Sequence, residues 1–510
     1  MCTGVCACPR PTPPNLQPVP CSLGTIVMTD PSPDPRLWNE DLAPVPQDKR
    51  TWTWWNVAAL WIGMAVCITT YTLASSLIQQ GMNWWQATLT IFLGNVIVLV
   101  PMTLNAHPGT SYGIPFPVLL RAAFGTRGAN VPALMRGLVA CGWFGIQTWV
   151  GGAAIYATAA VILGFDPAAR QPLPVLGISA GEFLCFMIFW AVNVWFIVRG
   201  MDSIKWMEVA SAPFLLVVGL ALVGWAWQAA HGFGPIFLQP GKLTTHAEFW
   251  PVFGSGLTAM IGYWATLSLN IPDFSRYARS QRDQVIGQVV GLPTTMTFYS
   301  FIGIVVTSAT VVIFGEAIWD PVQVIARFGN PWLSALALIT LVVATLSTNI
   351  AANVVSPAND FAALAPRLVS FRTGGLITAA IGVLMFPWKL YQDPSGYIFT
   401  WLIGYSALLG PIAGIMIADY FIWRRRKLIV NDLYRSSGAY RYSGGFSLVA
   451  FACLAVAVLP NLPGFLVRIG AAGESAFPGW LVAGYHYAWF TGFALGLLLY
   501  SLLRPLFPNR

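Results

Sequence analysis

Charged side chains are the scarcest feature of this 510-residue chain: Asp, Glu, Lys and Arg make up 9% of it, whereas hydrophobic residues make up 56%. Soluble domains carry roughly a quarter charged residues, so the composition excludes an ordinary soluble protein and indicates a polytopic membrane protein. The phosphate-binding sequence G-x-x-x-x-G-K-[ST] is also missing. Its absence argues against ATP-driven transport by this chain alone.

Histidine is rare too, and we expect the four histidines (residues 107, 231, 246 and 486) far apart, in loops or in the last apolar segment. A membrane enzyme needs a nucleophile, a base or a metal cluster, so this alternative is weak, and conversion of a substrate into product would revive it. A channel is a third class, but repeated filter loops and charged rings are missing. Saturable, concentrative uptake would exclude a channel.

Apolar segments of membrane-spanning length recur along the chain. We predict an all-α polytopic membrane protein with twelve transmembrane helices, at residues 57–78, 84–104, 130–163, 180–199, 208–229, 251–271, 288–314, 333–353, 374–388, 397–422, 445–461 and 480–503. The ninth segment is the weakest because it is short.

The net charge of +8 is distributed as in a membrane protein. With the N-terminus inside and twelve alternating spans, only five of the 27 Lys and Arg residues fall outside the cytoplasmic side: Arg170, Lys242, Arg327, Lys389 and Arg468. Such a bias is typical of membrane topology. It predicts a multi-pass protein of the cell membrane with both termini in the cytoplasm, and it makes a nucleic-acid partner a weak alternative.

The predicted organisation is a cytoplasmic tail, two five-helix units, two additional helices and a cytoplasmic C-terminus, at residues 1–50, 51–229, 251–422, 423–503 and 504–510. Residues 1–27 are rich in proline and hold four of the eight cysteines (Cys2, Cys6, Cys8 and Cys21), but they contain no apolar core. Because Met28 opens a polar segment that looks like a natural N-terminus, we interpret residues 1–27 as an artefact of start-site choice rather than a metal or redox site.

Many secondary transporters contain two related halves with discontinuous helices in corresponding positions. Glycine interrupts the first and the sixth apolar segments, which correspond if the first ten helices form two five-helix repeats. Gly63 and Gly262 are therefore candidate break points. The alternative is that each glycine only permits close packing between helices.

Four polar side chains are concentrated in the last seven residues of the eighth apolar segment: Ser347, Thr348, Asn349 and Asn353. A bilayer offers no water to satisfy them, so they must face a protein interior or a cavity. Ser347 and Thr348 offer adjacent oxygens that could join backbone carbonyls around a small cation. Asn349 and Asn353 are four residues apart and share a helix face. An ion site beside a polar ligand site is what a coupled transporter needs.

The third apolar segment places an aromatic surface, Trp143, one turn from an amide, Gln147. A flat ring with alternating N–H and C=O groups would stack on the indole and satisfy the amides of Gln147 and Asn353. We expect no Asp, Glu, Lys or His near the middle of any core span, so the predicted substrate is neutral. The missing carboxylate relay favours Na⁺ over H⁺ as the coupling ion.

Five segments resemble the nucleobase–cation symport-1 family: residues 39–44, 107–117, 142–147, 271–274 and 347–353. They follow one another in the family's order across roughly residues 39–440. The resemblance implies a LeuT-like fold, with two inverted five-helix repeats and two C-terminal helices. It also implies alternating access and cation-coupled import of nucleobases, hydantoins or allantoin.

The resemblance further implies a set of site residues. The family's two stacking tryptophans correspond to Trp143 and Trp264, its substrate amides to Gln147 and Asn353, and a backbone contact to Tyr263. Its sodium ligands correspond to the carbonyls of Gly63, Val66 and Ala344 and the hydroxyls of Ser347 and Thr348.

Two positions depart from the hydantoin-transporting pattern of this family. Cys67 replaces a glutamine, and Tyr263 replaces a glycine. Both changes reshape the pocket, so hydantoin specificity does not transfer, and residues 39–44 and 107–117 look more like the allantoin and uracil branches. The leading hypothesis is a monomeric importer of a neutral ring, allantoin or a hydantoin first and uracil or another nucleobase second. It is coupled to Na⁺, with H⁺ as the alternative, and needs no cofactor.

Overall fold

The computed structural model describes residues 33–167, 171–199, 216–328, 330–393 and 396–507. Within these ranges the chain is helical; its β-type pairing is limited to isolated bridges such as the one between Trp52 and Ala278. Residues 1–27 and the start of the predicted fifth span, residues 208–215, lie outside the described part.

Within the described ranges, nine helical stretches are long and apolar enough to cross a membrane, and a bent helix pair makes a tenth. The nine are α3 (Trp84–Tyr112), α5 (Asn130–Leu163), α6 (Ala180–Arg199), α9 (His246–Asn270), α11 (Gln281–Phe314), α13 (Pro331–Asn353) with α14 (Val355–Leu364), α17 (Ile403–Ile417) with a π-helical turn at each end, α18 (Leu448–Val458) with α19 (Leu462–Arg468), and α20 (Gly479–Gly484) with α21 (Ala488–Leu503). The shorter connecting helices include α4 (Phe116–Phe124), α8 (Phe233–Phe237), α10 (Pro272–Ser275), α12 (Pro321–Ala326) and α16 (Pro387–Leu390).

Each of the twelve predicted spans contains an apolar helix. The bent pair is α1 (Trp54–Ala65) with α2 (Ile68–Gln79), and two shorter apolar helices, Leu216–Ala229 and α15 (Phe371–Leu384), correspond to the fifth and ninth segments. Two boundaries move. The second helix continues to Tyr112, so His107 is helical and not in a loop as predicted, and the helix of the eighth segment is followed directly by α14.

The predicted helix breaks are half right. The first span bends by 59° between α1 and α2, but the break lies at Val66 and Cys67, and Gly63 is still helical. The sixth span is one unbroken helix, so the prediction of a break at Gly262 is wrong. A Cβ at Gly262 would lie 2.9 Å from the Leu402 carbonyl oxygen. This glycine therefore permits close packing, as the alternative interpretation held.

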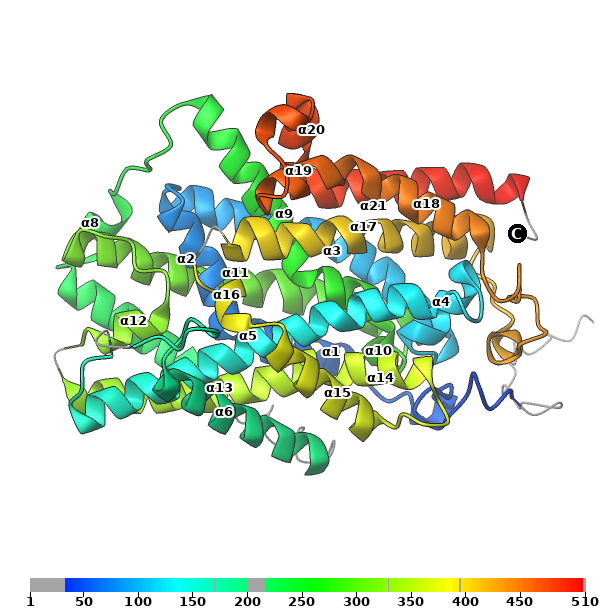
Figure 1. Cartoon of the computed structure of the whole chain (residues 1–510), viewed down its shortest axis with the longest axis horizontal. Helices are drawn as coiled ribbons and strands as arrows, with labels where there is room; N and C mark the ends of the chain where they lie inside the picture. Colours follow the sequence, from blue (N-terminus) through cyan, green and yellow to red (C-terminus); the bar gives the residue numbers. More distant parts are fainter. Residues whose placement is uncertain (1–32, 168–170, 200–215, 329, 394–395, 508–510) are drawn as a thin grey trace, which may run out of the picture. The chain divides into compact units, whose positions relative to one another are not determined.

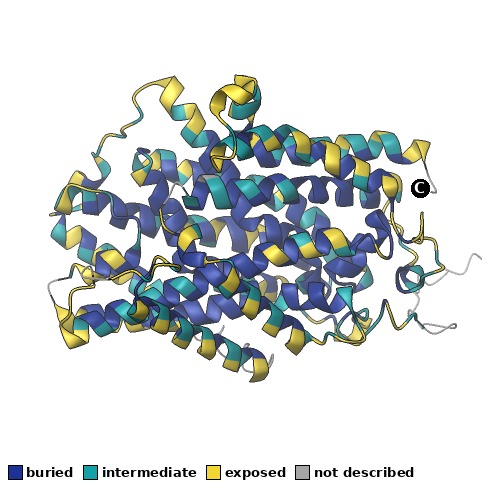
Figure 2. Cartoon of the chain, viewed as in Figure 1, coloured by how far each residue is buried: buried dark blue, intermediate teal, exposed yellow. Residues whose placement is uncertain are grey.

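The helices pack around α5 and α9. Helix α5 contacts α6, α13, α14 and α15, while α9 packs against α3 and α17 (Figure 1). In the most apolar stretch of each helix, 89% of α9 is buried but only 33% of α6. Figure 2 shows the buried residues gathered in the inner helices. Exposed apolar side chains on α6, such as Leu184 and Trp195, form the kind of surface that faces lipid.

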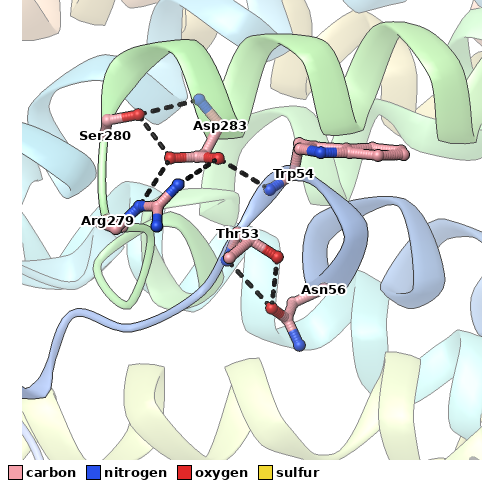
Figure 3. Close-up of polar contacts among 6 residues, drawn as sticks. All are labelled: Thr53, Trp54, Asn56, Arg279, Ser280 and Asp283. Carbon is pink, nitrogen blue, oxygen red and sulfur yellow. Dashed lines mark hydrogen bonds and ion pairs between the residues drawn. The ribbon is translucent and has the colours of Figure 1, made fainter.

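The start of α1 is attached to the start of α11 (Figure 3). The backbone N–H of Trp54 donates to Asp283 Oδ1 at 3.0 Å, and the Ser280 hydroxyl donates to Asp283 Oδ2 at 2.6 Å. Arg279 forms an ion pair with the same carboxylate. The Asp283 carboxylate thus satisfies a backbone donor at the start of α1, while the Ser280 hydroxyl caps α11 by accepting from the backbone N–H of Asp283.

Candidate functional site

A small pocket with a cavity volume of about 20 Å³ lies among α1, α5, α9 and α13. It brings together five of the six predicted substrate residues and one predicted ion ligand, Thr348. Its ten lining residues are Met64, Trp143, Gln147, Tyr263, Trp264, Thr266, Leu267, Thr348, Ala352 and Asn353. The sixth predicted substrate residue, Cys67, does not line this space, but its sulfur lies 3.2 Å from the Tyr263 hydroxyl.

Hydrogen bonds hold both predicted tryptophans in place. The indole N–H of Trp143 donates to the Tyr405 hydroxyl at 3.2 Å, and that hydroxyl donates to the Gly262 carbonyl at 2.8 Å. The indole N–H of Trp264 donates to Asn95 Oδ1 at 3.1 Å. With the polar atom of each indole satisfied by the protein, the ring surfaces are what each tryptophan can offer a ligand.

Tyr263 contacts both tryptophans. Its ring centroid lies 5.0 Å from that of Trp143 and 4.9 Å from that of Trp264, with edge-to-face geometry in both cases. Its hydroxyl is 2.7 Å from Thr69 Oγ1 and 3.2 Å from Cys67 Sγ. The side chain of Tyr263, and not only its backbone as the family resemblance implied, therefore forms part of the site.

Gln147 presents an unsatisfied acceptor to the pocket. Its amide nitrogen donates to Thr69 Oγ1 at 3.3 Å, while its carbonyl oxygen Oε1 is buried without a hydrogen-bond partner. Buried polar atoms are nearly always bonded. This oxygen can accept a hydrogen bond from an N–H or O–H donor that enters the pocket.

The orientation of Asn353 is set by a neighbouring amide. Asn349 donates from Nδ2 to the Phe144 carbonyl at 3.3 Å and to Asn193 Oδ1 at 3.1 Å. A backbone carbonyl can only accept, so this bond fixes which end of the Asn349 amide is the nitrogen. Asn349 Oδ1 then accepts from Asn353 Nδ2 at 3.0 Å. The remaining polar atom of Asn353, on the pocket wall, is its carbonyl oxygen.

The predicted ion ligands lie on two packed elements. Val66 is buried at the break after α1, and α1 contacts α13, which carries Ala344, Ser347 and Thr348. The Thr348 hydroxyl donates to the Ala344 carbonyl at 3.3 Å. At the break, the Cys67 N–H bonds to the Ala65 carbonyl and so does not engage Gly63 as a continuous helix would. Neutral hydroxyl and carbonyl oxygens of this kind suit a small hard cation.

Several residues of the pocket were not predicted from the sequence. Met64, Thr266, Leu267 and Ala352 line the pocket without a distinctive pattern. Thr69 carried a signal, because Thr69 and Thr70 are adjacent polar residues within the first apolar segment. The supporting residues Asn95, Tyr405 and Asn193 contact the site from other helices, and a lone asparagine inside an apolar segment is the signal that could have identified Asn95 and Asn193.

Asp273 and Arg276, near the end of α9, each bond to the backbone of another segment. Asp273 Oδ1 accepts from the backbone N–H of Phe116 at 2.9 Å, and Arg276 donates to the Asp41 carbonyl at 3.0 Å. Burial raises the pKa of the Asp273 carboxyl, although the charge of Arg276 opposes the shift. Through these bonds, both side chains connect the end of α9 to the backbone of other segments of the chain.

The family described as "Permease for cytosine/purines, uracil, thiamine, allantoin" matches residues 44–492. The chain is 45% identical to a purine-uracil permease of Arabidopsis thaliana, over 92% of this chain and 78% of the relative. It is 43% identical to an allantoin permease of Bacillus subtilis, over 93% of this chain and 94% of the relative.

Among solved structures, the closed, bromovinylhydantoin-bound form of the nucleobase–cation-symport-1 transporter Mhp1 matches with a TM-score of 0.75 and 28% identity. The match covers 93% of this chain and 97% of that one. The helical arrangement is therefore the predicted LeuT-like fold. The family consists of permeases and not enzymes, and these matches confirm the predicted family: the chain belongs to the nucleobase–cation symport-1 family, as a multi-pass membrane permease.

Proposed function

We propose that this permease is a cation-coupled importer of a neutral, N–H-bearing heterocycle, with allantoin or a hydantoin as the substrate and Na⁺ as the coupling ion. The observation that carries the proposal is the buried, unpartnered Oε1 of Gln147 on the wall of an aromatic pocket. An N–H of the ligand satisfies this oxygen, while Trp143 and Trp264 contact the ring. None of the ten lining residues is charged, which supports a neutral ligand.

The polarity of the two amides supports a substrate rich in N–H groups. Gln147 offers Oε1, and Asn353, held by Asn349, offers its own carbonyl oxygen. Two acceptors facing one ring suit the N–H groups of a ureide, and the B. subtilis relative is an allantoin permease. The second candidate is uracil or another nucleobase. It is favoured by the 45% identity to a purine-uracil permease.

For the ion, the proposal assigns five oxygens: the carbonyls of Gly63, Val66 and Ala344 and the hydroxyls of Ser347 and Thr348. Bound Na⁺ would join the broken first span to α13 and so order the pocket wall that contains Thr348. Among the described residues no group of three or more His, Cys, Asp and Glu is placed to hold a metal. Weak binding by neutral oxygens suits an ion that must be released in each cycle; H⁺ remains the alternative.

The proposal also includes the membrane arrangement. Residues 51–229 and 251–422 form the two repeats, and residues 423–503 form two further helices. The chain acts as a monomer in the cell membrane, with both termini in the cytoplasm. The described start of the chain and the C-terminal end lie at one end of the helices (Figure 1). The backbone N–H of Asp34 bonds to the Tyr434 carbonyl there. The basic residues 424–427 follow the tenth helix, as a cytoplasmic loop requires.

The test is uptake of labelled allantoin by cells that express the chain, with and without a Na⁺ gradient, in competition with hydantoin, uracil, cytosine and adenine. Na⁺-stimulated uptake that hydantoin blocks is expected. Gln147→Ala and Asn353→Ala should each remove most uptake at normal expression, and full activity of both would refute the site. Uptake of uracil alone would favour the second candidate. Allantoin uptake that follows pH and ignores Na⁺ would refute the ion assignment.

Ser347→Ala combined with Thr348→Ala tests the ion site separately. The double variant should need a higher Na⁺ concentration for half-maximal uptake. Ser334→Ala on the same helix is the matched control, because its buried hydroxyl bonds to the Ile325 carbonyl outside the pocket. Unchanged Na⁺ activation in the double variant would contradict the assignment.

A further inference from the structure

The Tyr263 phenol occupies space beside both predicted stacking partners. It is 6% exposed, and its ring contacts the indoles of Trp143 and Trp264 edge-on. A ligand ring that stacks on either indole on this side meets the phenol as the wall of its pocket. One side chain therefore limits the space that the pocket leaves for the ligand ring.

Three side chains at the break of the first span hold this phenol in place. Its hydroxyl oxygen lies 2.7 Å from Thr69 Oγ1, 3.2 Å from Thr70 Oγ1 and 3.2 Å from Cys67 Sγ. A phenol hydroxyl can donate one hydrogen bond and accept two, so all three contacts can be satisfied together. Rotating the ring out of the pocket would leave the buried hydroxyl without these partners, which buried polar groups rarely tolerate.

We infer that Tyr263 is the residue that limits the size of the transported ring: its anchored phenol admits unsubstituted or flexibly substituted rings and excludes rings that carry a second aromatic group. This inference rests on the proposed function, since it concerns the same pocket. Thr69 is a positioning residue in this arrangement. It bonds to the Tyr263 hydroxyl and also accepts from Gln147, so the wall and the substrate amide share one hydroxyl.

The test compares how strongly hydantoin and 5-benzylhydantoin compete with labelled allantoin in the wild type, Tyr263→Ala and Tyr263→Phe. In the wild type, hydantoin should compete much better. Tyr263→Ala should improve the relative competition by 5-benzylhydantoin about 10-fold or more, the range expected when a pocket gains space for an apolar group. Tyr263→Phe keeps the ring but loses the anchor, so its selectivity should lie between the two.

Tyr156→Ala is the control for shortening a tyrosine. Tyr156 lies on the same helix as Trp143, is partly exposed and packs against Phe165 outside the pocket. It should keep wild-type selectivity. If Tyr263→Ala does not transport, the same ligand ratio is measured as thermal stabilisation of purified protein. Thr69→Val is a second variant, which removes the shortest of the three contacts of the phenol hydroxyl.

The outcomes separate this inference from the proposed function. Equal competition by the two hydantoins in the wild type, or an unchanged ratio in Tyr263→Ala, overturns the size limit while allantoin transport stands. If the wild type carries uracil and not allantoin, the proposed substrate fails, and uracil and 5-benzyluracil replace the hydantoins in the same comparison. A gain for the benzyl compound in Tyr263→Ala then still supports the role of Tyr263.

Discussion

The ion pair between Arg136 on α5 and Asp360 on α14 offers the sharpest stability test. Both side chains are buried, with 0% and 1% exposure, and a single contact of 3.2 Å joins Arg136 Nη1 to Asp360 Oδ2. Arg136 Nε and Nη2 and Asp360 Oδ1 have no hydrogen-bond partner. The pair therefore loses the solvation of two charges and regains only part of it through hydrogen bonds.

These contacts predict a strongly non-additive double-mutant cycle. Arg136→Met or Asp360→Leu alone leaves the other charge buried and unpaired, which costs about 3–5 kcal/mol in the free energy of unfolding. The double variant removes both charges and fills the space with apolar atoms. It should unfold with a free energy within about 1 kcal/mol of the wild type, or higher. The expected coupling between the two substitutions is therefore several kcal/mol.

The assay is unfolding of the four purified proteins in one detergent, followed by intrinsic fluorescence against denaturant or temperature. The matched control is the pair Arg327–Glu316, which is 43% and 60% exposed with a shorter contact of 2.8 Å. Its single variants, Arg327→Met and Glu316→Gln, should change the free energy of unfolding by about 0–1 kcal/mol. Single variants at the buried pair that are as mild as the control, or a double variant as unstable as the sum of the singles, would refute the reasoning.

Three further predictions concern single residues. Asn349→Ala frees the Asn353 amide and should weaken substrate binding by about tenfold, since one buried hydrogen bond of roughly 1–2 kcal/mol is at stake; unchanged affinity in a binding assay would contradict the orientation argument. Gly262→Leu should lower the free energy of unfolding by about 1–3 kcal/mol through overpacking against Leu402, and an unchanged thermal midpoint would refute the close approach. Asp283→Ala removes the acceptor of the Trp54 N–H and should speed hydrogen exchange there; the wild-type rate would show that this bond does not hold α1.

The sequence predicted what depends on neighbours along one helix. Spanning length is a property of a single apolar segment, and all twelve predicted segments contain a helix. Trp143 with Gln147, and Asn349 with Asn353, could be paired because residues four apart share a helix face. The structure adds to the second pair a direct bond of 3.0 Å.

Contacts between distant segments could not be predicted in this way. The Tyr263 hydroxyl reaches Thr69 across 194 residues, and Trp143 reaches Tyr405 across 262. Their side chains are ordinary ones for apolar helices, and only tertiary packing gives them a role. The ion pair of Arg136 with Asp360 was missed for the same reason, since each alone looks like a charge at a helix end.

The two glycines show why residue type alone did not place the breaks. A Cβ at Gly63 would meet nothing within 4 Å, whereas one at Gly262 would meet the Leu402 carbonyl. Glycine can relax the backbone or admit a neighbour, and the sequence does not say which. In the first span the bend falls at Val66 and Cys67, where carbonyls leave the helical pattern.

Because of the position of that bend, the proposed ion ligands lie close to the residues that position the substrate. Thr69 follows Val66 by three residues and bonds to Gln147 and Tyr263. A shift of the break when a cation binds would therefore move the hydroxyl that positions the substrate amide and the aromatic wall. Thr348 belongs to the proposed ion ligands and also lines the pocket. Coupling then needs no long pathway, because both sites share the same two helix segments.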